Sequence, residues 1–343
     1  MEGGLVKNWN ALLQKFPDEI KDVYFQEEYM KLYEKEAEEA VCFVFEKNDK
    51  IFLFPFLRRQ FEYQDNIYYD FETAYGYGGP IANVEDDEFF NQAMESFKNY
   101  CSEHNYIAGF VRFHPLINNQ KILSKIGSVI FDRHTVAIDL SLSDEEIWMK
   151  EIHKQNRNLI KKGAKLGLEF IVDREFKNID EFVKLYDLTM NKVGADSFYY
   201  FDKNYYILFK SNIKNSFLGL VKFNGKIIAG AIFFYSKDYG HYHLSASNPK
   251  YLRMNPNNFM LFEASKELKA LGIKKFHLGG GYDAEEQNSL FQFKRKFSRS
   301  KYDFYIGKLI FNQMIYSEIC EDWIKRNPQK QEKYKHYLLK YKY

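Results

Sequence analysis

The stretch SFLGLVKFNGKIIAGAIFFY, residues 216–235, consists of two apolar runs joined by an Asn-Gly pair at 224–225. Two such runs around Asn-Gly are the typical signature of a tight β-hairpin. A similar order occurs about 170 residues earlier, where AVCFVF and IFLFPFLRR flank an Asn-Asp-Lys turn at 48–50. The sequence therefore predicts two equivalent hairpins, one in each half of the chain.

The elements around the two hairpins repeat as well. In both halves a helix precedes the hairpin, and a third strand, a second helix and a fourth strand follow it. We therefore predict an α+β fold made of two copies of one module, each a mixed β-sheet flanked by helices. The repeated helices are expected at 26–37 and 179–193 and at 86–103 and 257–270, and the last strands at 107–114 and 274–280.

The boundary between the modules is predicted from a helix start. Ser143 is followed three residues later by Glu146, which is the pattern of a capping box. We therefore place domain 1 at 1–143 and domain 2 at 144–310.

Composition excludes several classes of protein. The chain has 343 residues, of which 45% are hydrophobic, so it can bury a large core. Its three cysteines lie far apart and match neither a disulfide framework nor a zinc site. No long apolar run or signal peptide is evident. We expect a cytoplasmic protein without a membrane span, metal or bound cofactor.

The net charge of +2 hides three basic tracts. Residues 150–165 hold six Lys or Arg and one acid, residues 294–301 hold five and none, and residues 325–343 hold seven and one. Clustered cations suit a phosphate-rich partner, although each tract is equally compatible with a solvated helix face.

The order of elements resembles the GNAT acyltransferase fold, and particular strings resemble the Fem-type family of tandem-GNAT proteins. The strings are YGYGGP, RFHPLINN, RNLIKKGAKLG, HYHLSASN and LGGGYDAEEQNSLFQFKRKFS. The family includes aminoacyltransferases that build peptidoglycan cross-bridges. The helical arm of some members has no counterpart here, so the chain resembles the arm-less, FemX-like branch. The resemblance also implies that residues 311–343 return to pack on domain 1.

The resemblance implies acyl transfer to an amine from either a tRNA ester or a coenzyme A thioester. Coenzyme A is normally held in GNAT domains by a glycine-rich loop at a helix N-terminus. The equivalent segment here, SNPKYLRMNPNN at 247–258, has no glycine. This absence favours aminoacyl-tRNA as the donor. A variant cofactor loop built on Arg253, Asn255, Asn257 and Asn258 stays open as an alternative.

The catalytic candidates lie in the second half. In LGGGYDAEEQNSLFQFKRKF the three glycines allow close approach of a backbone or ligand, and Leu290, Phe291, Phe293 and Phe297 are expected to anchor the next element in the core. By similarity to the family's FKxxF segment, Lys294 is expected to place a positive charge near the acyl carbonyl or the RNA end. His243, on a strand whose polar side chains alternate onto one face, is a candidate base.

The remaining candidates are binding residues. Arg112 and His114 are expected to lie on one strand face and bind an acceptor phosphate or carboxylate, and the resemblance implies that Asp70, Tyr75 and Tyr77 line an acceptor groove. A bulged strand end is an equal alternative for the YGYGGP turn. Donor or RNA contacts are expected from the residues Arg157, Lys161, Arg253, Asn258 and Arg295.

The sequence thus predicts an N-acyltransferase that joins an aminoacyl group from aminoacyl-tRNA to an amine of a peptidoglycan precursor. The precursor would be nucleotide-linked or lipid-linked, and the protein could work peripherally at the membrane. One alternative is an acyl-CoA-dependent N-acyltransferase that acts on an amino sugar of a surface polysaccharide. The other is a binding protein that kept the GNAT fold without turnover.

Overall fold

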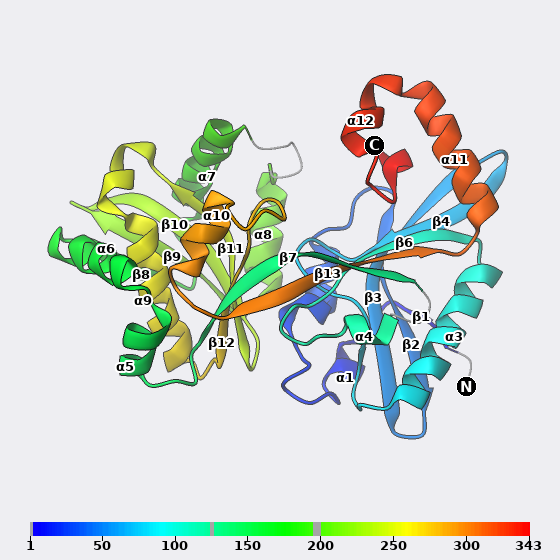
Figure 1. The fold of residues 1–343 in the computed structure, drawn as a ribbon, viewed down its shortest axis with the longest axis horizontal. Coiled ribbons are helices and arrows are strands. Elements are labelled where there is room, and N and C mark those ends of the chain that lie inside the picture. The colour runs from blue at the N-terminus through cyan, green and yellow to red at the C-terminus, as the bar shows by residue number, and fades with distance from the viewer. Residues whose placement is uncertain (1–2, 124–126, 195–199) are drawn as a thin grey trace. The chain divides into compact units, whose positions relative to one another are not determined.

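The computed structural model describes residues 3–123, 127–194 and 200–343. It divides into two compact units, each a mixed sheet flanked by helices (Figure 1). Unit 1 comprises Met1–Asp132 with Phe304–Tyr343, and unit 2 comprises Arg133–Asp303. The predicted fold class is confirmed. In the described part of the chain, no helix has the length and apolar character needed to cross a membrane.

The sheet of unit 1 has the strand order β1-β2-β3-β4-β6-β13, with β5 paired to β3. All of these neighbours are antiparallel except β4 and β6, which are parallel. The strands are β1 Gly4–Val6, β2 Glu38–Lys47, β3 Lys50–Tyr63, β4 Asn66–Glu72, β5 Ile81–Ala82, β6 Tyr106–Arg112 and β13 Lys301–Ile310.

The core of unit 1 is rich in phenylalanine. Strand β3 is buried along most of its first half, and Phe54 on it meets Phe97 with ring centroids 5.0 Å apart. Phe97 belongs to α3, whose start is capped by the Asp86 carboxylate accepting from the Phe89 N–H at 2.9 Å. The first helices and turns are α1 Asn10–Leu13, η1 Val23–Phe25, α2 Glu27–Lys31, α3 Asp87–Glu103 and α4 Gln120–Leu123.

The helix expected at 26–37 is much shorter in the structure. It ends at Lys31, and β2 begins at Glu38. The Glu- and Lys-rich stretch has helix propensity, but the pairing of β2 with β3 already starts at Glu38 and overrides it.

The C-terminal segment lies in unit 1. Leu338 and Leu339 pack in a small apolar cluster with Ile107 and Ala108 of β6. The elements of this segment are α11 Gln313–Arg326, η5 Pro328–Lys330, α12 Gln331–Tyr334 and η6 Lys340–Lys342.

The sheet of unit 2 repeats the arrangement of unit 1, with the order β7-β12-β11-β10-β9-β8. Here β11 and β12 are the parallel neighbours. The predicted hairpin at 216–235 is confirmed as β9 and β10. The strands are β7 Ser128–Asp139, β8 Glu169–Asp173, β9 Ser216–Phe223, β10 Lys226–Tyr235, β11 Tyr239–Ser247 and β12 Lys275–Gly280.

Helices cover both faces of this sheet. On β10, Phe233 belongs to the core beneath α6, α9 and α10, whereas Phe234 faces Phe209 of α8 with ring centroids 6.1 Å apart. The helices are α5 Asp144–Glu146, η2 Ile147–Glu151, α6 Lys154–Lys165, α7 Ile179–Val193, α8 Lys203–Asn212, η4 Pro249–Met254, α9 Pro256–Ala270 and α10 Ser289–Arg295.

The capping box at the start of the second module is confirmed. The Ser143 hydroxyl accepts from the Glu146 N–H at 3.2 Å, and the Glu146 carboxylate accepts from the Ser143 N–H at 3.1 Å. The helix that it opens is short, because the chain becomes extended at Ile152 before α6 begins.

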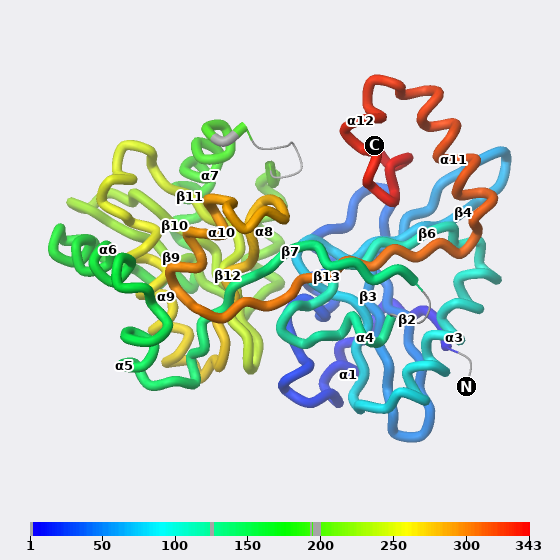
Figure 2. The backbone as a smooth tube through the Cα atoms, in the orientation of Figure 1, coloured from blue at the N-terminus to red at the C-terminus, as the bar shows by residue number. Residues whose placement is uncertain are grey.

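The two units are divided within strands. Strands β7 and β13 each begin in one unit and end in the other, as the backbone trace in Figure 2 lets the reader follow. The divisions therefore fall at 132/133 and 303/304. The boundaries predicted from the sequence, 143/144 and 310/311, lie after these strands. The apolar pattern of a sequence shows where a strand lies, but it does not show to which of two cores each half of the strand contributes.

Candidate active site

The parallel strands β11 and β12 of unit 2 run together only at their beginning. Within these two described strands, the backbone pairing ends at His241 and His277. Beyond that point β11 continues on β10 as far as Ser247, and β12 continues on β7 as far as Gly280. The strands therefore separate toward their carboxyl ends. The carboxyl ends of parallel strands are where α/β sheets usually bind ligands.

Each of the three glycines at the end of β12 stands at a position where a larger residue would be sterically unfavourable. Gly279 has a φ of 78°, which disfavours other residues. A Cβ at Gly280 would lie 2.9 Å from the carbonyl oxygen of His134, and a Cβ at Gly281 would lie 2.7 Å from Cγ of Asn288. The predicted close approach is confirmed, and its partners are a neighbouring backbone and the residue that precedes α10.

Lys294 lies where β11 and β12 separate. Its side chain is largely buried, with 8% of the residue exposed, and Nζ donates a hydrogen bond to the Gly280 carbonyl at 2.7 Å. The same Nζ lies 5.9 Å from the ring centroid of Tyr242, within the range of a cation–π contact. Gly280 is the last residue of β12, and Tyr242 is the first residue of β11 beyond the paired section.

Burial, with a smaller contribution from the nearby charge of Arg133, lowers the pKa of Lys294 to about 7. Arg133 is itself held by a hydrogen bond from Nη1 to the Gly281 carbonyl at 3.0 Å. A lysine with this pKa is present in both charged and neutral forms near neutral pH. Such tuning is common in active sites.

Helix α10 holds Lys294 through caps and anchors. The Asn288 side chain accepts from the N–H groups of Leu290 and Phe291 at 3.0 and 3.1 Å. Phe291 and Phe297 are buried, as predicted. The prediction that Leu290 is a core anchor is wrong, because this residue is 38% exposed and lies on the outer side of the helix.

His243 and Lys294 lie on different faces of the sheet. Neighbouring residues of a strand point to opposite faces, and Tyr242 faces Lys294. The His243 Nε2 lies 2.7 Å from the Tyr205 hydroxyl of α8, and its ring stacks on Phe209. Burial, with a contribution from His241, lowers the pKa of His243 to about 3. An imidazole with this pKa is a weak proton acceptor at neutral pH.

Arg157 and Lys161 of α6 contact the preceding turn. Arg157 Nη1 donates to the carbonyls of Trp148, Met149 and Ile152 at 3.1, 3.2 and 2.6 Å. These are end carbonyls of η2, so the guanidinium closes that turn. Lys161 Nζ lies 5.6 Å from the ring centroid of Trp148. The expected phosphate stripe is thus occupied in part by structural contacts.

The other three predicted donor-binding residues are dispersed in unit 2. Asn258 is buried and donates to the Asn156 side chain at 2.7 Å, and Arg253 is exposed in η4. Arg295 donates to the carbonyls of Ser298 and Ser300 at 2.9 and 3.3 Å. Arg295 also lines an open hollow at the surface of unit 2.

The predicted acceptor residue Asp70 forms an internal ion pair in unit 1. Its carboxylate is 1% exposed and accepts from Nε of Arg59 at 2.9 Å and from Nη2 of the same residue. The Arg59 guanidinium also lies over the rings of Phe61 and Tyr341. Direct contact between an acceptor and Asp70 would require this ion pair to open.

Arg112 and His114 are engaged by different partners. Arg112 donates to the Glu72 carboxylate at 3.1 Å and to the Thr73 carbonyl at 2.8 Å. His114 is buried, with Nε2 2.7 Å from the Asp22 carboxylate, and its Nδ1 accepts from the Leu116 N–H at 3.2 Å. The proton therefore resides on Nε2. Strand β6 ends at Arg112, so the expected shared strand face does not extend to His114.

Tyr75 and Tyr77 lie in the YGYGGP turn. The Tyr75 carbonyl accepts from the Tyr29 hydroxyl at 2.8 Å, and the Tyr77 ring contacts Tyr24 and His114 edge-on. The turn itself is held by the buried amide of Asn119, which donates to the carbonyls of its second glycine and its proline at 2.8 and 3.0 Å. Both half-buried tyrosines remain candidates for acceptor binding.

Sequence reasoning missed Arg133 and Tyr242. Arg133 lies at the start of its unit, and its contact with Gly281 joins positions 148 residues apart. Tyr242 lies on the face of β11 opposite His243, and its contact with Lys294 depends on where β11 leaves β12. A polar pattern in the sequence could have found neither residue.

Comparisons with known proteins agree with this architecture. Residues 150–295 match the model of the acetyltransferase (GNAT) domain. A structure described as the crystal structure of FemX is 16% identical and has a TM-score of 0.68 over 93% of this chain and 100% of its own. No curated protein matches the chain significantly.

Two further structures have the same fold. The C-terminal domain of a putative lysylphosphatidylglycerol synthetase from Agrobacterium fabrum is 14% identical, covers 90% of this chain and 91% of its own, and has a TM-score of 0.56. L-PGS from Bacillus licheniformis is 14% identical, with coverages of 87% and 91% and a TM-score of 0.52. Residues 150–295 are thus a GNAT acyltransferase domain, and the whole chain has the fold of the Fem-type tandem-GNAT proteins.

Proposed function

We propose that this protein transfers an aminoacyl group from aminoacyl-tRNA to an amine of a peptidoglycan precursor in the cytoplasm. The precursor is nucleotide-linked or, at the membrane surface, lipid-linked. The observation that carries the proposal is the buried ammonium of Lys294 in the gap between β11 and β12. Such a group can meet negative charge that develops on a reacting carbonyl.

The reaction needs no covalent intermediate on the protein. The neutral acceptor amine attacks the ester carbonyl, and a C–N bond forms while the carbonyl oxygen becomes negative. The charged form of Lys294 stabilises this oxyanion. When the oxyanion collapses, the C–O bond to the ribose breaks, and the proton lost by the amine passes to the ribose hydroxyl. With His243 on the opposite face, the substrates themselves are the proposed carriers of that proton.

The start of α9 supports tRNA rather than coenzyme A as the donor. Pro256 has no N–H, and the N–H groups of Asn258 and Phe259 donate to the Asn255 carbonyl at 3.2 and 3.3 Å. The Asn257 side chain accepts from the Ser247 hydroxyl at 2.7 Å. A pyrophosphate at this helix end would therefore find few unoccupied backbone donors. A fold neighbour named for lysylphosphatidylglycerol synthesis is also compatible with an aminoacyl donor.

A second candidate is an acyl-CoA-dependent N-acyltransferase that acts on an amino sugar of a surface polysaccharide. It is favoured by the match of residues 150–295 to an acetyltransferase domain. The Lys294 site would serve a thioester equally well, because its carbonyl develops the same negative charge.

The test is a transfer assay with two labelled donors. Total aminoacyl-tRNA and acetyl-CoA are each incubated with the protein and with nucleotide-linked or lipid-linked muropeptides or amino-sugar acceptors, and amide products are identified by mass spectrometry. We expect an aminoacylated muropeptide from the tRNA pool only. A product from acetyl-CoA alone would replace the proposal by the second candidate.

A further inference from the structure

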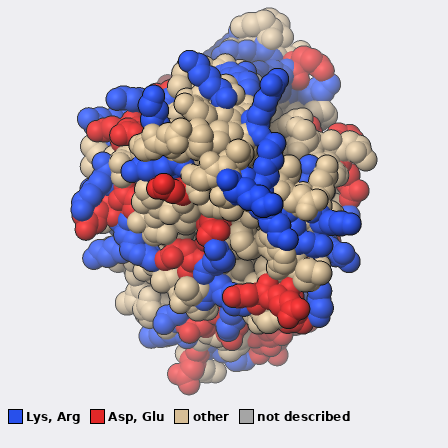
Figure 3. Space-filling model, turned by 90° about the vertical axis from the view of Figure 1, so that its left-hand side faces the viewer, with Lys and Arg blue, Asp and Glu red and all other residues tan. Residues whose placement is uncertain are grey.

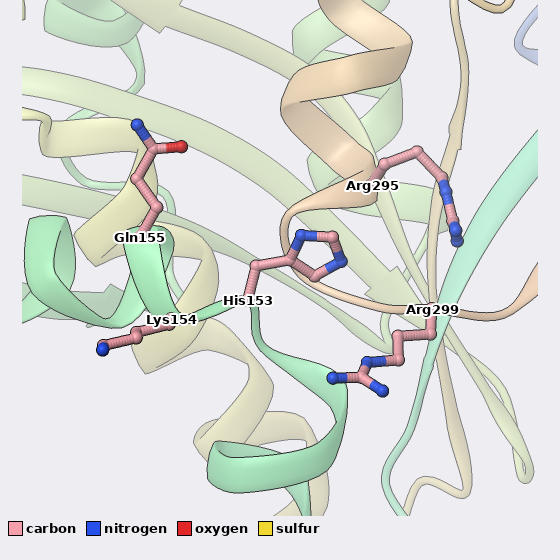
Figure 4. A pocket seen from close by; sticks show the side chains of 5 residues that line it. All are labelled: His153, Lys154, Gln155, Arg295 and Arg299. Atoms are coloured by element: carbon pink, nitrogen blue, oxygen red, sulfur yellow. The ribbon is translucent and has the colours of Figure 1, made fainter.

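An open hollow of about 520 Å³ lies at the surface of unit 2. It is formed where the beginning of α6 meets the segment that follows α10, and its lining residues are His153, Lys154, Gln155, Arg295 and Arg299 (Figure 4). None of these lining residues, all within the described chain, is acidic. Figure 3 views the molecule from the side of unit 2 and shows lysines and arginines over much of that face.

Two arginines and a histidine line one part of this hollow. In Figure 4 the imidazole of His153 points toward Arg295 and Arg299, whereas Lys154 points the other way. Burial and then the charges of Arg295, Arg299 and Lys296 lower the pKa of His153, so three positive charges lie near this side chain. Among the described residues, no carboxylate forms an ion pair with Arg299.

The walls of the hollow are held in place by the backbone. The His153 N–H donates to the Lys296 carbonyl at 3.0 Å, and the buried Asn156 side chain donates to the same carbonyl at 3.2 Å. Arg295 is fixed on its two carbonyl acceptors, and the nearby Glu151 carboxylate is bound by the Ser298 hydroxyl. A charged group entering the hollow would thus meet a rigid set of donors.

The start of α6 adds further donors. His153 precedes the helix, and no side chain caps it in the described structure. The first N–H groups of a helix have no acceptor within the helix and carry a partial positive charge. The first residues of α6 line the same hollow as the two arginines, and a phosphate is the ligand that both kinds of donor recognise.

We propose that this hollow binds a phosphate of the RNA backbone, near the end that carries the aminoacyl group. The inference rests on the proposed function, because it takes aminoacyl-tRNA to be the donor. Arg295 directly follows Lys294 on α10, so an RNA strand held at Arg295 and Arg299 would keep its acylated end close to the gap between β11 and β12. The open shape suits a strand that passes across the surface.

The experiment measures RNA binding by the full chain across a salt series. Total tRNA is the probe, and the variants are Arg299→Gln and the double variant Arg295→Gln/Arg299→Gln. Because each phosphate contact contributes roughly 0.7–0.9 to the slope of log K against log salt concentration, we expect the slope to fall by about one for the single variant. The matched control is Lys226→Gln, which removes an exposed charge at the first residue of β10.

The outcomes separate this inference from the proposed function. A wild-type protein that binds tRNA with a steep salt slope, together with an Arg299→Gln variant whose slope is unchanged, would overturn the hollow as the site. Absence of tRNA binding at low salt would overturn the proposed donor and the inference together. Acetyl-CoA is titrated in parallel, and weaker acetyl-CoA binding by the variant with unchanged tRNA binding would assign the hollow to the cofactor's phosphates instead.

Thermal unfolding tests whether a variant binds RNA less well only because the variant is less stable. Arg295 holds two carbonyls, so the double variant can lose stability, whereas Arg299 is exposed. We expect Arg299→Gln to have the same melting temperature as the wild type. This single variant is therefore sufficient to test whether the hollow binds RNA.

Discussion

The two units share one strand order but treat their parallel strands differently. In unit 2, β11 and β12 stop pairing at His241 and His277, and Lys294 lies where they separate. In unit 1, β4 and β6 stay paired to the end of β4 at Glu72, and a further bridge joins Gly78 to Phe113. The same architecture therefore leaves the parallel strands separated at their carboxyl ends in one copy and joined in a closed seam in the other.

The closed seam of unit 1 is held by charges. The Glu72 carboxylate binds Arg112 and Lys342, and Lys342 also binds Glu38. Lys342 comes from the last turn of the chain, so the C-terminal segment is fastened at the end of β4. Buried charge therefore differs between the two copies: the Glu72 carboxylate of unit 1 is paired with cations, whereas the buried cation Lys294 of unit 2 contacts a carbonyl and an aromatic ring.

The largest effect is expected from removing that single cation. Lys294→Met should lower turnover by roughly ten- to a thousand-fold, because the developing oxyanion loses its positive partner. Single-turnover transfer assays with the labelled donor would measure it. Lys294→Arg is the informative companion, since arginine stays charged at all accessible pH values and should flatten any loss of activity above pH 7. A change below threefold in Lys294→Met would show that unit 2 does not use this residue.

The next effect concerns the seam of unit 1. Although burial acts to raise it, Arg112 and Lys342 lower the pKa of Glu72 to about 2. A lowered carboxylate pKa means that the stabilisation is present above pH 4.5 and is lost as the pH falls toward 2. Glu72→Gln should therefore cost about 3 kcal/mol of unfolding free energy at pH 7 and much less at pH 2.

Denaturant unfolding at both pH values would measure the cost. Glu146→Gln is the matched control, because the pKa of Glu146 is also lowered to about 2, by Lys150 and then Ser143, although its side chain is 38% exposed. Solvent screening should make its effect far smaller. Equal costs for Glu72→Gln and Glu146→Gln would contradict a buried, closed seam.

A smaller effect is expected in how stability depends on pH. The pKa of Lys294 is lowered to about 7, so between pH 7 and 10.5 the native state binds fewer protons than the unfolded state. The wild type should therefore gain stability relative to Lys294→Met as the pH rises. The expected gain is about 2 kcal/mol from pH 7 to pH 8.5. Denaturant titrations of both proteins between pH 7 and pH 8.5 measure this gain. If the unfolding free energies of the two proteins changed equally with pH, the pKa of Lys294 would not be lowered and the prediction would be wrong.

The smallest effect is expected at His243. Since its pKa is about 3 and its ring is bonded to Tyr205, His243→Gln should change turnover less than threefold at pH 7. Steady-state rates with saturating acceptor test this. A hundredfold loss with an unchanged melting temperature would restore the histidine as a catalytic base.

The sequence predicted the features that depend on neighbouring residues. The hairpin at 216–235, the capping box at Ser143 and the buried anchors Phe291 and Phe297 follow from local spacing. The importance of Lys294 came from a family resemblance, and the structure adds its burial and its lowered pKa. These features could be read in advance because short-range geometry determines them.

Other features depend on contacts between distant positions. Asp70 pairs with Arg59 and Arg157 contacts backbone carbonyls, so two residues expected to bind substrates have internal partners that the sequence did not indicate. The hollow beside Arg299 joins two segments that lie far apart in the sequence. Which side chains meet on the sheet depends on the strand register and on the path of β11 away from β12. No local sequence pattern encodes either of these.

The crossing strand β13 has a consequence for biosynthesis. Unit 2 is continuous in the chain, whereas unit 1 needs β13 beside β6 and Lys342 beside Glu72. Domains generally fold as units while the ribosome delivers the chain from its N-terminus. The first 132 residues must therefore wait, with the edge of β6 unpaired, until β13 has been translated, and Lys342 joins Glu72 later still. An exposed strand edge invites aggregation, so a chain truncated before β13 should aggregate even though residues 150–295 are present.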